Sequence, residues 1–128
     1  MQNTHEQHER QYVYDFSTMK KEAMIGKTST SEGSSFTGER IYCGLVTKRP
    51  GTGSKPHYHP DETFNYVLQG TLDVEMDGQR FQVPQGCLLH IPPNMVHTAV
   101  ATGDAEAVYL VWRDRIGEKA GQPVVVEV

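Results

Sequence analysis

The stretch that decides the fold is residues 57–70, HYHPDETFNYVLQG, in which His57 and His59 head a run of alternating apolar and polar residues. Side chains at positions i and i+2 of a strand point to the same face, so these two histidines would present both imidazoles to one point. Imidazole is a good ligand for zinc, copper, iron and nickel. The pair alone is equally compatible with a surface loop between Pro56 and Pro60 whose histidines are solvated.

A second segment, residues 78–97, reads GQRFQVPQGCLLHIPPNMVH. Its composition predicts a turn at 84–86, a short apolar strand at 87–91 and a second turn at 92–94. His97 follows this second turn, where an adjacent antiparallel strand can deliver it beside the first pair. The two segments together predict a three-histidine metal site inside a β-barrel.

With these residues the chain resembles the cupin superfamily. The first motif of that family spaces a glycine, an H-x-H pair, a glutamate and a second glycine, and the second motif ends on a third histidine. The resemblance implies an all-β fold, a single cupin barrel (a double-stranded β-helix, jelly-roll-like). We expect residues 1–10 to form a polar tail and residues 11–128 the cupin domain, with a motif core at 51–97. The matching positions are Gly51, His57, His59 and Gly70 in the first motif and Gly78, Pro84, Gly86 and His97 in the second.

One position departs from the family pattern, because Thr63 stands where the metal-binding glutamate is expected. Glu62 lies one residue earlier and faces away on a regular strand, although a local bulge would let it serve as a fourth ligand. Asp61 shares the parity of the histidines but follows Pro60, so we expect it at the rim. Three neutral imidazoles leave the charge of the metal uncompensated, which favours an anionic, chelating small molecule. They also leave open coordination positions, as in catalytic metal sites.

Three further residues are candidates for the surroundings of the metal. Thr63 and Asn65 share strand parity with the histidines, and buried polar groups need hydrogen-bond partners. They would hold a water or a substrate oxygen; alternatively, Asn65 bonds a neighbouring side chain and Thr63 fills space. His90 lies on the strand of the second motif, where it would orient a ligand histidine or the substrate, or simply pack as a strand residue.

The resemblance implies a divalent transition metal and an enzyme that acts on a small oxygenated organic molecule. Cupins with three histidines and no glutamate include iron-dependent dioxygenases, so the sharpest hypothesis is Fe(II)-dependent cleavage of a carbon–carbon bond in a diketone or hydroxyketone. Manganese, nickel or copper would also serve that chemistry. Zinc has no redox chemistry and would point to an isomerase, lyase or cyclase. The third hypothesis is a non-catalytic ligand-binding cupin, because no general base is obvious.

Composition narrows the class of partner. The chain has 128 residues and a formal net charge of -4, with an isoelectric point near 5.8, and this balance argues against a nucleic-acid surface. The polar N-terminus lacks the apolar stretch of a secretory signal, and no window is long enough to span a membrane. We therefore expect a cytoplasmic protein. His5 and His8 are interpreted as part of a flexible tail, and Cys43 and Cys87 as reduced, buried thiols.

The remaining signals are almost all for strands. Residues 11–16 predict a first strand and the serine-rich run 28–38 predicts a loop. The Asp-Gly pair at 77–78 is a strong hairpin signal. The apolar run PVVVEV at 123–128 needs a sheet edge, in its own barrel or in a second copy, and on this ground we expect a homodimer. Further strands are predicted at 39–48, 71–76, 79–83, 87–91, 96–101 and 106–113.

Overall fold

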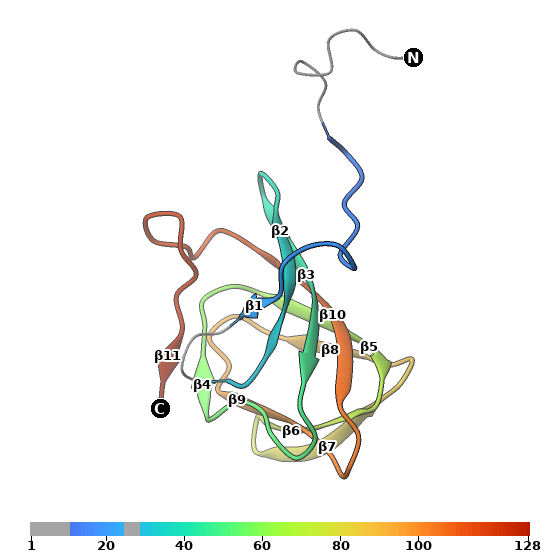
Figure 1. Ribbon diagram of the computed structural model, residues 1–128. Helices are drawn as coiled ribbons and strands as arrows, with labels where there is room; N and C mark the ends of the chain where they lie inside the picture. The colour runs from blue at the N-terminus through green and yellow to red at the C-terminus, as the bar shows by residue number, and fades with distance from the viewer. Residues whose placement is uncertain (1–10, 25–28) are drawn as a thin grey trace, which may run out of the picture.

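The computed structural model describes residues 11–24 and 29–128, and within these ranges it contains strands and no helix (Figure 1). The predicted tail at 1–10, with His5 and His8, and the first residue of the predicted loop lie outside the described residues. Among the described residues no helix is long and apolar enough to cross a membrane. The strands are β1 (Glu22–Ala23), β2 (Glu32–Thr37), β3 (Ile41–Lys48), β4 (His57–Tyr58), β5 (Thr63–Gln69), β6 (Thr71–Met76), β7 (Gln79–Pro84), β8 (Leu88–Ile91), β9 (His97–Ala101), β10 (Ala107–Asp114) and β11 (Val126–Glu127).

The strands form two antiparallel sheets that face each other, which is the jelly-roll barrel predicted from the sequence (Figure 1). One sheet has the order β1-β2-β3-β10-β5-β8 and the other the order β11-β4-β9-β6-β7. Strands such as β5, β8 and β9 have one buried face, because buried residues alternate along them with more exposed ones. On β5, for example, Thr63, Asn65 and Val67 are buried, whereas Tyr66 and Leu68 are exposed.

The interior is divided along the strands into an apolar part and a polar part. Inward residues of β5 change from Thr63 and Asn65 to Val67 along the strand. The neighbouring antiparallel strand β10 changes in the matching direction, from buried Ala107 at its start to Arg113 near its end. The apolar core therefore closes one end of the barrel and leaves the other end lined with polar groups. The buried apolar residues are Val46, Val67, Leu72, Val74, Val83, Leu89, Ile91, Ala99, Ala101, Ala107 and Tyr109.

Two predicted segments are wrong. Residues 11–16 form no strand, and the Tyr14 ring packs instead on Phe36 of β2, with 4.0 Å between ring centroids. Most of the predicted loop at 28–38 is strand β2, which pairs with β3 along its whole length. A Cβ on Gly33 would lie 2.0 Å from the Leu45 carbonyl oxygen. The small residues of this segment therefore permit close strand packing and do not mark a loop.

The C-terminal run joins a sheet edge of its own chain. Strand β11 pairs with β4, placing Glu127 opposite His57, and the Val128 amide donates to the Pro56 carbonyl oxygen over 3.1 Å. This pairing removes the sequence argument for a second copy at that edge. The hairpin predicted between β6 and β7 is present, with positive φ angles at Asp77 and Gly78.

Both cysteines are free thiols. They differ in exposure, because Cys43 is half-buried whereas Cys87 is exposed. Part of the prediction for Cys87 is therefore wrong, since the residue lies between the turn at 85–86 and β8 and not within a buried strand.

Candidate metal centre and its cavity

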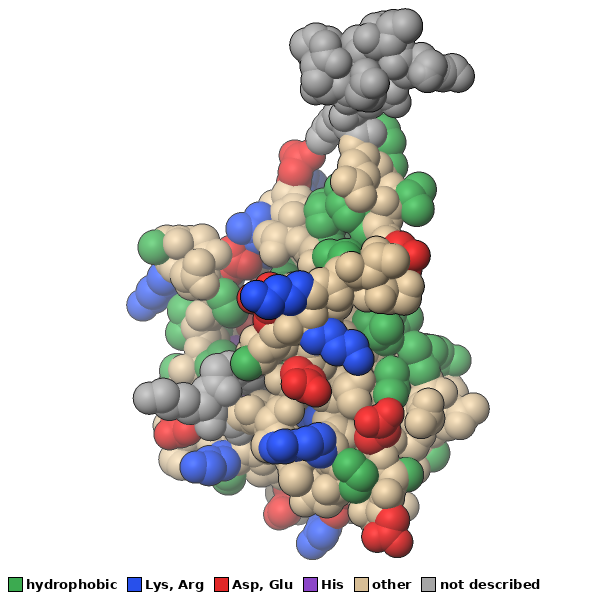
Figure 2. Space-filling view, viewed as in Figure 1, with side chains coloured by type: hydrophobic (Ala, Val, Ile, Leu, Met, Phe, Trp, Pro, Cys, Tyr) green, Lys and Arg blue, Asp and Glu red, His purple; other side chains and the backbone are tan. Residues whose placement is uncertain are grey.

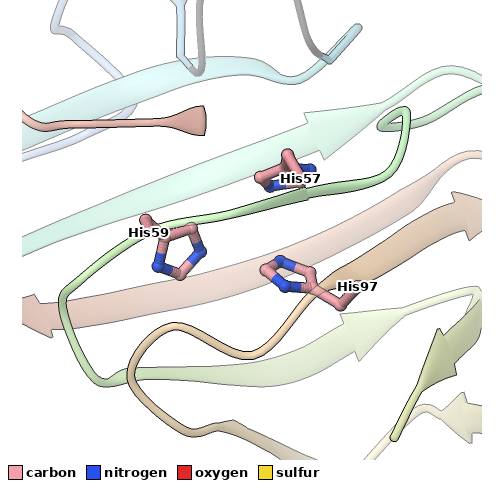
Figure 3. A group of neighbouring side chains, drawn as sticks. All are labelled: His57, His59 and His97. Carbon is pink, nitrogen blue, oxygen red and sulfur yellow. The ribbon is translucent and has the colours of Figure 1, made fainter. Parts of the chain in front are cut away.

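The structure brings together the three histidines that the sequence singled out (Figure 3). His57 begins β4, His59 follows that strand, and His97 begins β9 opposite His57. Their ring centroids are 4.4 to 5.7 Å apart, and one nitrogen from each ring lies within 4.8 Å of the others. All three side chains are buried. Such a group can hold a divalent metal ion.

The outer nitrogen of each ring has an acceptor that fixes its orientation. His57 Nδ1 lies 2.7 Å from the Lys55 carbonyl oxygen, and His97 Nδ1 lies 2.8 Å from that of Met95. A carbonyl oxygen only accepts, so Nδ1 donates and Nε2 is left bare. The Nε2 atom of His57 is buried without a partner. A bare, buried imidazole nitrogen is the donor that a transition metal needs.

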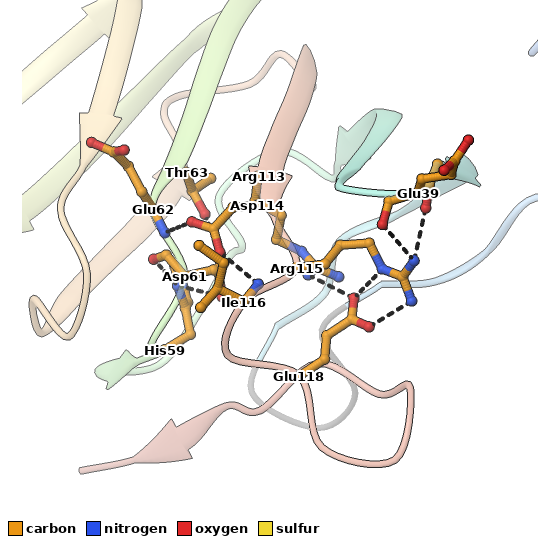
Figure 4. Close-up of polar contacts among 11 residues, drawn as sticks. Glu39, His59, Asp61, Glu62, Thr63, Arg113, Asp114, Arg115, Ile116 and Glu118 are labelled. Atoms are coloured by element: carbon orange, nitrogen blue, oxygen red, sulfur yellow. Dashed lines mark hydrogen bonds and ion pairs between the residues drawn. The ribbon is translucent and has the colours of Figure 1, made fainter.

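The third histidine is oriented by a carboxylate (Figure 4). His59 Nδ1 lies 3.2 Å from Asp61 Oδ1, and the Thr63 hydroxyl donates to Asp61 Oδ2 over 2.6 Å. Burial would raise the pKa of Asp61, but the hydrogen bonds from His59 and Thr63, with the charge of Arg113, hold it below its ordinary value. Asp61 thus stays ionised at neutral pH. It is buried and does not lie at the rim as predicted.

Replacing Asp61 with asparagine should weaken metal binding. Histidine ligands lose basicity and orientation without their carboxylate partner, which typically costs about 10- to 100-fold in affinity. A competition titration against a chromogenic chelator measures this. The matched control is Asp104→Asn, at an exposed turn position, for which we expect no change. Equal affinities in Asp61→Asn and wild type would contradict the assignment.

Burial also sets the charge state of the ligands. It lowers the pKa of His57 below its ordinary value and that of His97 to about 4, with a further contribution from the neighbouring cationic groups. Both rings are therefore neutral at pH 7, which is the form that binds a metal.

Two sequence candidates do not reach this site. The Glu62 carboxylate accepts a hydrogen bond from His90 Nε2 over 2.7 Å, and both side chains are about half exposed. His90 also stacks on Phe64, with ring centroids 5.1 Å apart, on the outer face of the sheet. Strands β5 and β8 pair in regular register here, so no bulge turns Glu62 inward. The structure supports neither Glu62 as a fourth ligand nor His90 as a partner of the site.

The histidines lie on the wall of a cavity of about 480 Å³, a size typical of small-molecule sites. Thr63 and Asn65 line it, as their parity predicted. Thr63 bonds Asp61, whereas the buried Oδ1 atom of Asn65 has no partner and is free to accept a hydrogen bond. Ser31, just before strand β2, and Ser35 and Thr37 within it add hydroxyl groups.

Sequence reasoning missed two cationic residues of this cavity. Lys48 is buried, with Nζ donating to Ser31 Oγ over 2.8 Å and to Ser29 Oγ over 3.1 Å. Burial lowers the pKa of Lys48 to about 8. Arg113 lies over the Tyr42 ring, 4.1 Å from its centroid. Strand parity could have indicated that Lys48 faces inward, because it lies two positions after Val46 on the same strand and so shares its face.

Comparison with known proteins agrees with this fold. Residues 44–113 match the Cupin domain family, and the chain belongs to that family.

Three relatives indicate the range of the similarity. The chain is 42% identical over 67 residues to the polyketide synthase CurC of Streptomyces cyaneus, a stretch covering 52% of this chain and 44% of CurC. It is 37% identical over 67 residues to the protein SchB of Streptomyces halstedii, covering 52% and 49%. The matched stretch thus spans about half the length of these curated relatives. The polyketide cyclase RemF of Streptomyces resistomycificus has a similar fold, with a TM-score of 0.78, 19% identity, and coverage of 93% of this chain and 86% of RemF.

Proposed function

We propose that this cupin is a metal-dependent enzyme that cyclises a small polyketone, a carbon chain bearing several ketone groups. One observation carries the proposal: three oriented imidazoles converge on the wall of a cavity large enough for such a molecule. The similarity to CurC and to RemF supports the choice of substrate class. The cyclase was one of the non-redox alternatives that the sequence left open.

The donor set fits the metal that this chemistry requires. Three neutral nitrogen donors suit zinc as well as iron, nickel or copper. A bound divalent ion would act as a Lewis acid that polarises ketone oxygens and so acidifies the carbons next to those ketones. The residues that would hold the ion are His57, His59 and His97. Asp61 supports the group through His59.

The rest of the cavity would position the chain for ring closure. Cyclisation moves a proton from a carbon next to a ketone, joins that carbon to a ketone carbon further along the same chain, and gives a proton to the oxygen of that second ketone. This sequence consumes no oxidant. Asn65 Oδ1 is placed to accept a hydrogen bond from an enol or hydroxyl of the substrate. Apolar side chains of Ile91 and Val111 exclude water from part of the wall.

A simple probe tests the reaction class. Heptane-2,4,6-trione closes to a dihydroxytoluene with loss of one water, which ultraviolet absorbance and mass spectrometry both detect. We expect zinc-loaded wild type and the outer-face variant His90→Ala to accelerate ring closure equally. His57→Ala should show only the background rate. Equal rates in wild type and His57→Ala would overturn the cyclase proposal.

A second candidate is the dioxygenase that the sequence favoured. The observation behind it is that Glu62 is turned outward, so that the described ligand group is all histidine. An oxygen electrode decides between the two. Oxygen uptake by the Fe(II)-loaded protein with acetylacetone, lost in His57→Ala, would favour the dioxygenase, whereas ring closure without oxygen uptake favours the cyclase.

We also propose that the chain forms a homodimer through the outer face of the larger sheet. Tyr66, Leu68 and Leu88 are 37%, 40% and 52% exposed and lie on the paired strands β5 and β8. Figure 2 shows hydrophobic side chains gathered along the right side of the view. Exposed apolar patches of this kind favour protein contacts. Sedimentation equilibrium tests the dimer, and a single-chain mass for wild type would overturn it.

A further inference from the structure

Lys48 carries a charge that the described structure does not neutralise. The residue is only 2% exposed, and none of the described carboxylates forms an ion pair with it. Its ammonium group has three donors, of which two reach Ser29 and Ser31. A buried cation without a counter-ion is costly to fold around. Its presence therefore calls for a reason beyond packing.

The cavity offers that reason, because the ammonium group shares it with the three histidines. Lys48, His57 and His97 all line the same space. The charge on Lys48 is close enough to lower the pKa of both histidines. The Tyr109 hydroxyl lies 3.4 Å from Ser31 Oγ and extends the polar group.

The other described cation of the cavity is already paired. Arg113 Nη1 lies 3.7 Å from Glu118 Oε2 (Figure 4). Its guanidinium group also lies over the Tyr42 ring. Lys48 is therefore the cavity cation that is left to meet an anion from outside.

We propose that Lys48, together with the hydroxyls of Ser31 and Tyr109, binds an anionic oxygen of the substrate, a carboxylate or an enolate. This inference rests on the proposed function, since the ketones of the same molecule would face the three histidines. It narrows the substrate class to a polyketone that carries a second, negatively charged end. Lys48 would then set the orientation of the carbon chain and so determine which carbon meets which ketone.

A ligand pair isolates the contribution of the charge. The probe is 3,5-dioxohexanoate, which has a diketone and a carboxylate, and the reference is its methyl ester, which keeps the carbon chain and masks the charge. Isothermal titration calorimetry on the zinc-loaded full chain gives both affinities for wild type, Lys48→Met, Lys48→Arg and Lys21→Met. Lys21 is an exposed lysine and supplies the matched control. Zinc content and melting curves check that each variant is folded and loaded.

We expect wild type, Lys48→Arg and Lys21→Met to prefer the acid over the ester by about tenfold or more, as charge-assisted hydrogen bonds do. Lys48→Met should lose this preference while keeping its affinity for the ester and its zinc. A preference that survives in Lys48→Met would overturn the inference. Heptane-2,4,6-trione has a third ketone in place of the carboxylate and so distinguishes a carboxylate site from an enolate site. Weaker binding of the trione to Lys48→Met than to wild type would assign the site to an enolate.

The same comparison on chelator-treated protein separates this inference from the proposed function. Failure of wild type to take up zinc on reconstitution would refute the metal-dependent cyclase. In that case, a preference for the acid that depends on Lys48 in the metal-free protein would still support the anion site. If neither the metal-free nor the zinc-loaded protein prefers the acid, the anion site is refuted and the cyclase proposal is not affected.

Discussion

Replacing Lys48 with methionine should raise the free energy of unfolding at pH 7 by about 3 kcal/mol. Burial lowers the pKa of Lys48 from its ordinary value of 10.5 to about 8. The folded chain therefore holds this proton less tightly than the unfolded chain, and each unit of pKa corresponds to about 1.4 kcal/mol. Methionine fills much of the same space without a charge to desolvate.

The pH dependence gives this prediction a definite sign. Because the folded pKa is depressed, the cost of the charged Lys48 is fully present below pH 8 and disappears as the pH rises to 10.5. Urea unfolding of the metal-free protein at pH 7 and at alkaline pH measures this difference. The gain of Lys48→Met over wild type should shrink with rising pH, and Lys21→Met should stay within about 0.5 kcal/mol of wild type. A Lys48→Met variant less stable than wild type at pH 7 would contradict the description of this residue.

Acidification should destabilise the metal-free protein through its histidines. Burial lowers the pKa of His97 from its ordinary value of 6.5 to about 4. Between these two values the unfolded chain binds more protons than the folded chain, so stability falls as the pH falls. His97 alone should account for about 3 kcal/mol between pH 6.5 and pH 4. The pKa of His57 is lowered as well, so it adds to the same loss.

Variants separate this effect from the titration of carboxylates, which also lowers stability in acid. As the pH is lowered from 6.5, the free energy of unfolding should fall more steeply for wild type than for His97→Gln. The control is Gln85→Ala at an exposed turn position, which removes no titratable group and should follow wild type across the range. Parallel curves for His97→Gln and wild type would show that His97 is not held neutral by burial.

The sequence predicted the metal centre better than the rest of the cavity, for a physical reason. Strand periodicity placed His57 and His59 on one face, and the turn before His97 set that residue opposite them. The same periodicity placed Thr63 and Asn65 inward. Periodicity could not show that Glu62 would pair with His90 on the outside, because this contact joins two strands that are distant in the sequence.

The sequence predictions are wrong or incomplete where the composition of a segment suggests exposure but the fold buries it. Strand β2 contains Gly33, Ser34 and Ser35, a run of small residues that normally indicates a loop. Its close approach to β3 explains why this run forms a strand. Lys48 ends a strand, where a lysine usually reaches solvent. Its burial depends on the hydroxyls of Ser29 and Ser31, which lie outside strands just before β2. These contacts join segments 17 and 19 residues apart in the sequence, so composition alone could not reveal the cationic end of the cavity.

The metal content of the purified protein tests the central claim most directly. The protein should be prepared without chelators or a histidine tag and examined by elemental analysis beside His57→Ala and His90→Ala. We predict close to one transition-metal ion per chain in wild type and in His90→Ala, and about a tenth of that or less in His57→Ala. Metal-free wild type after reconstitution with zinc and with iron, or equal metal in His57→Ala, would contradict the three-histidine site.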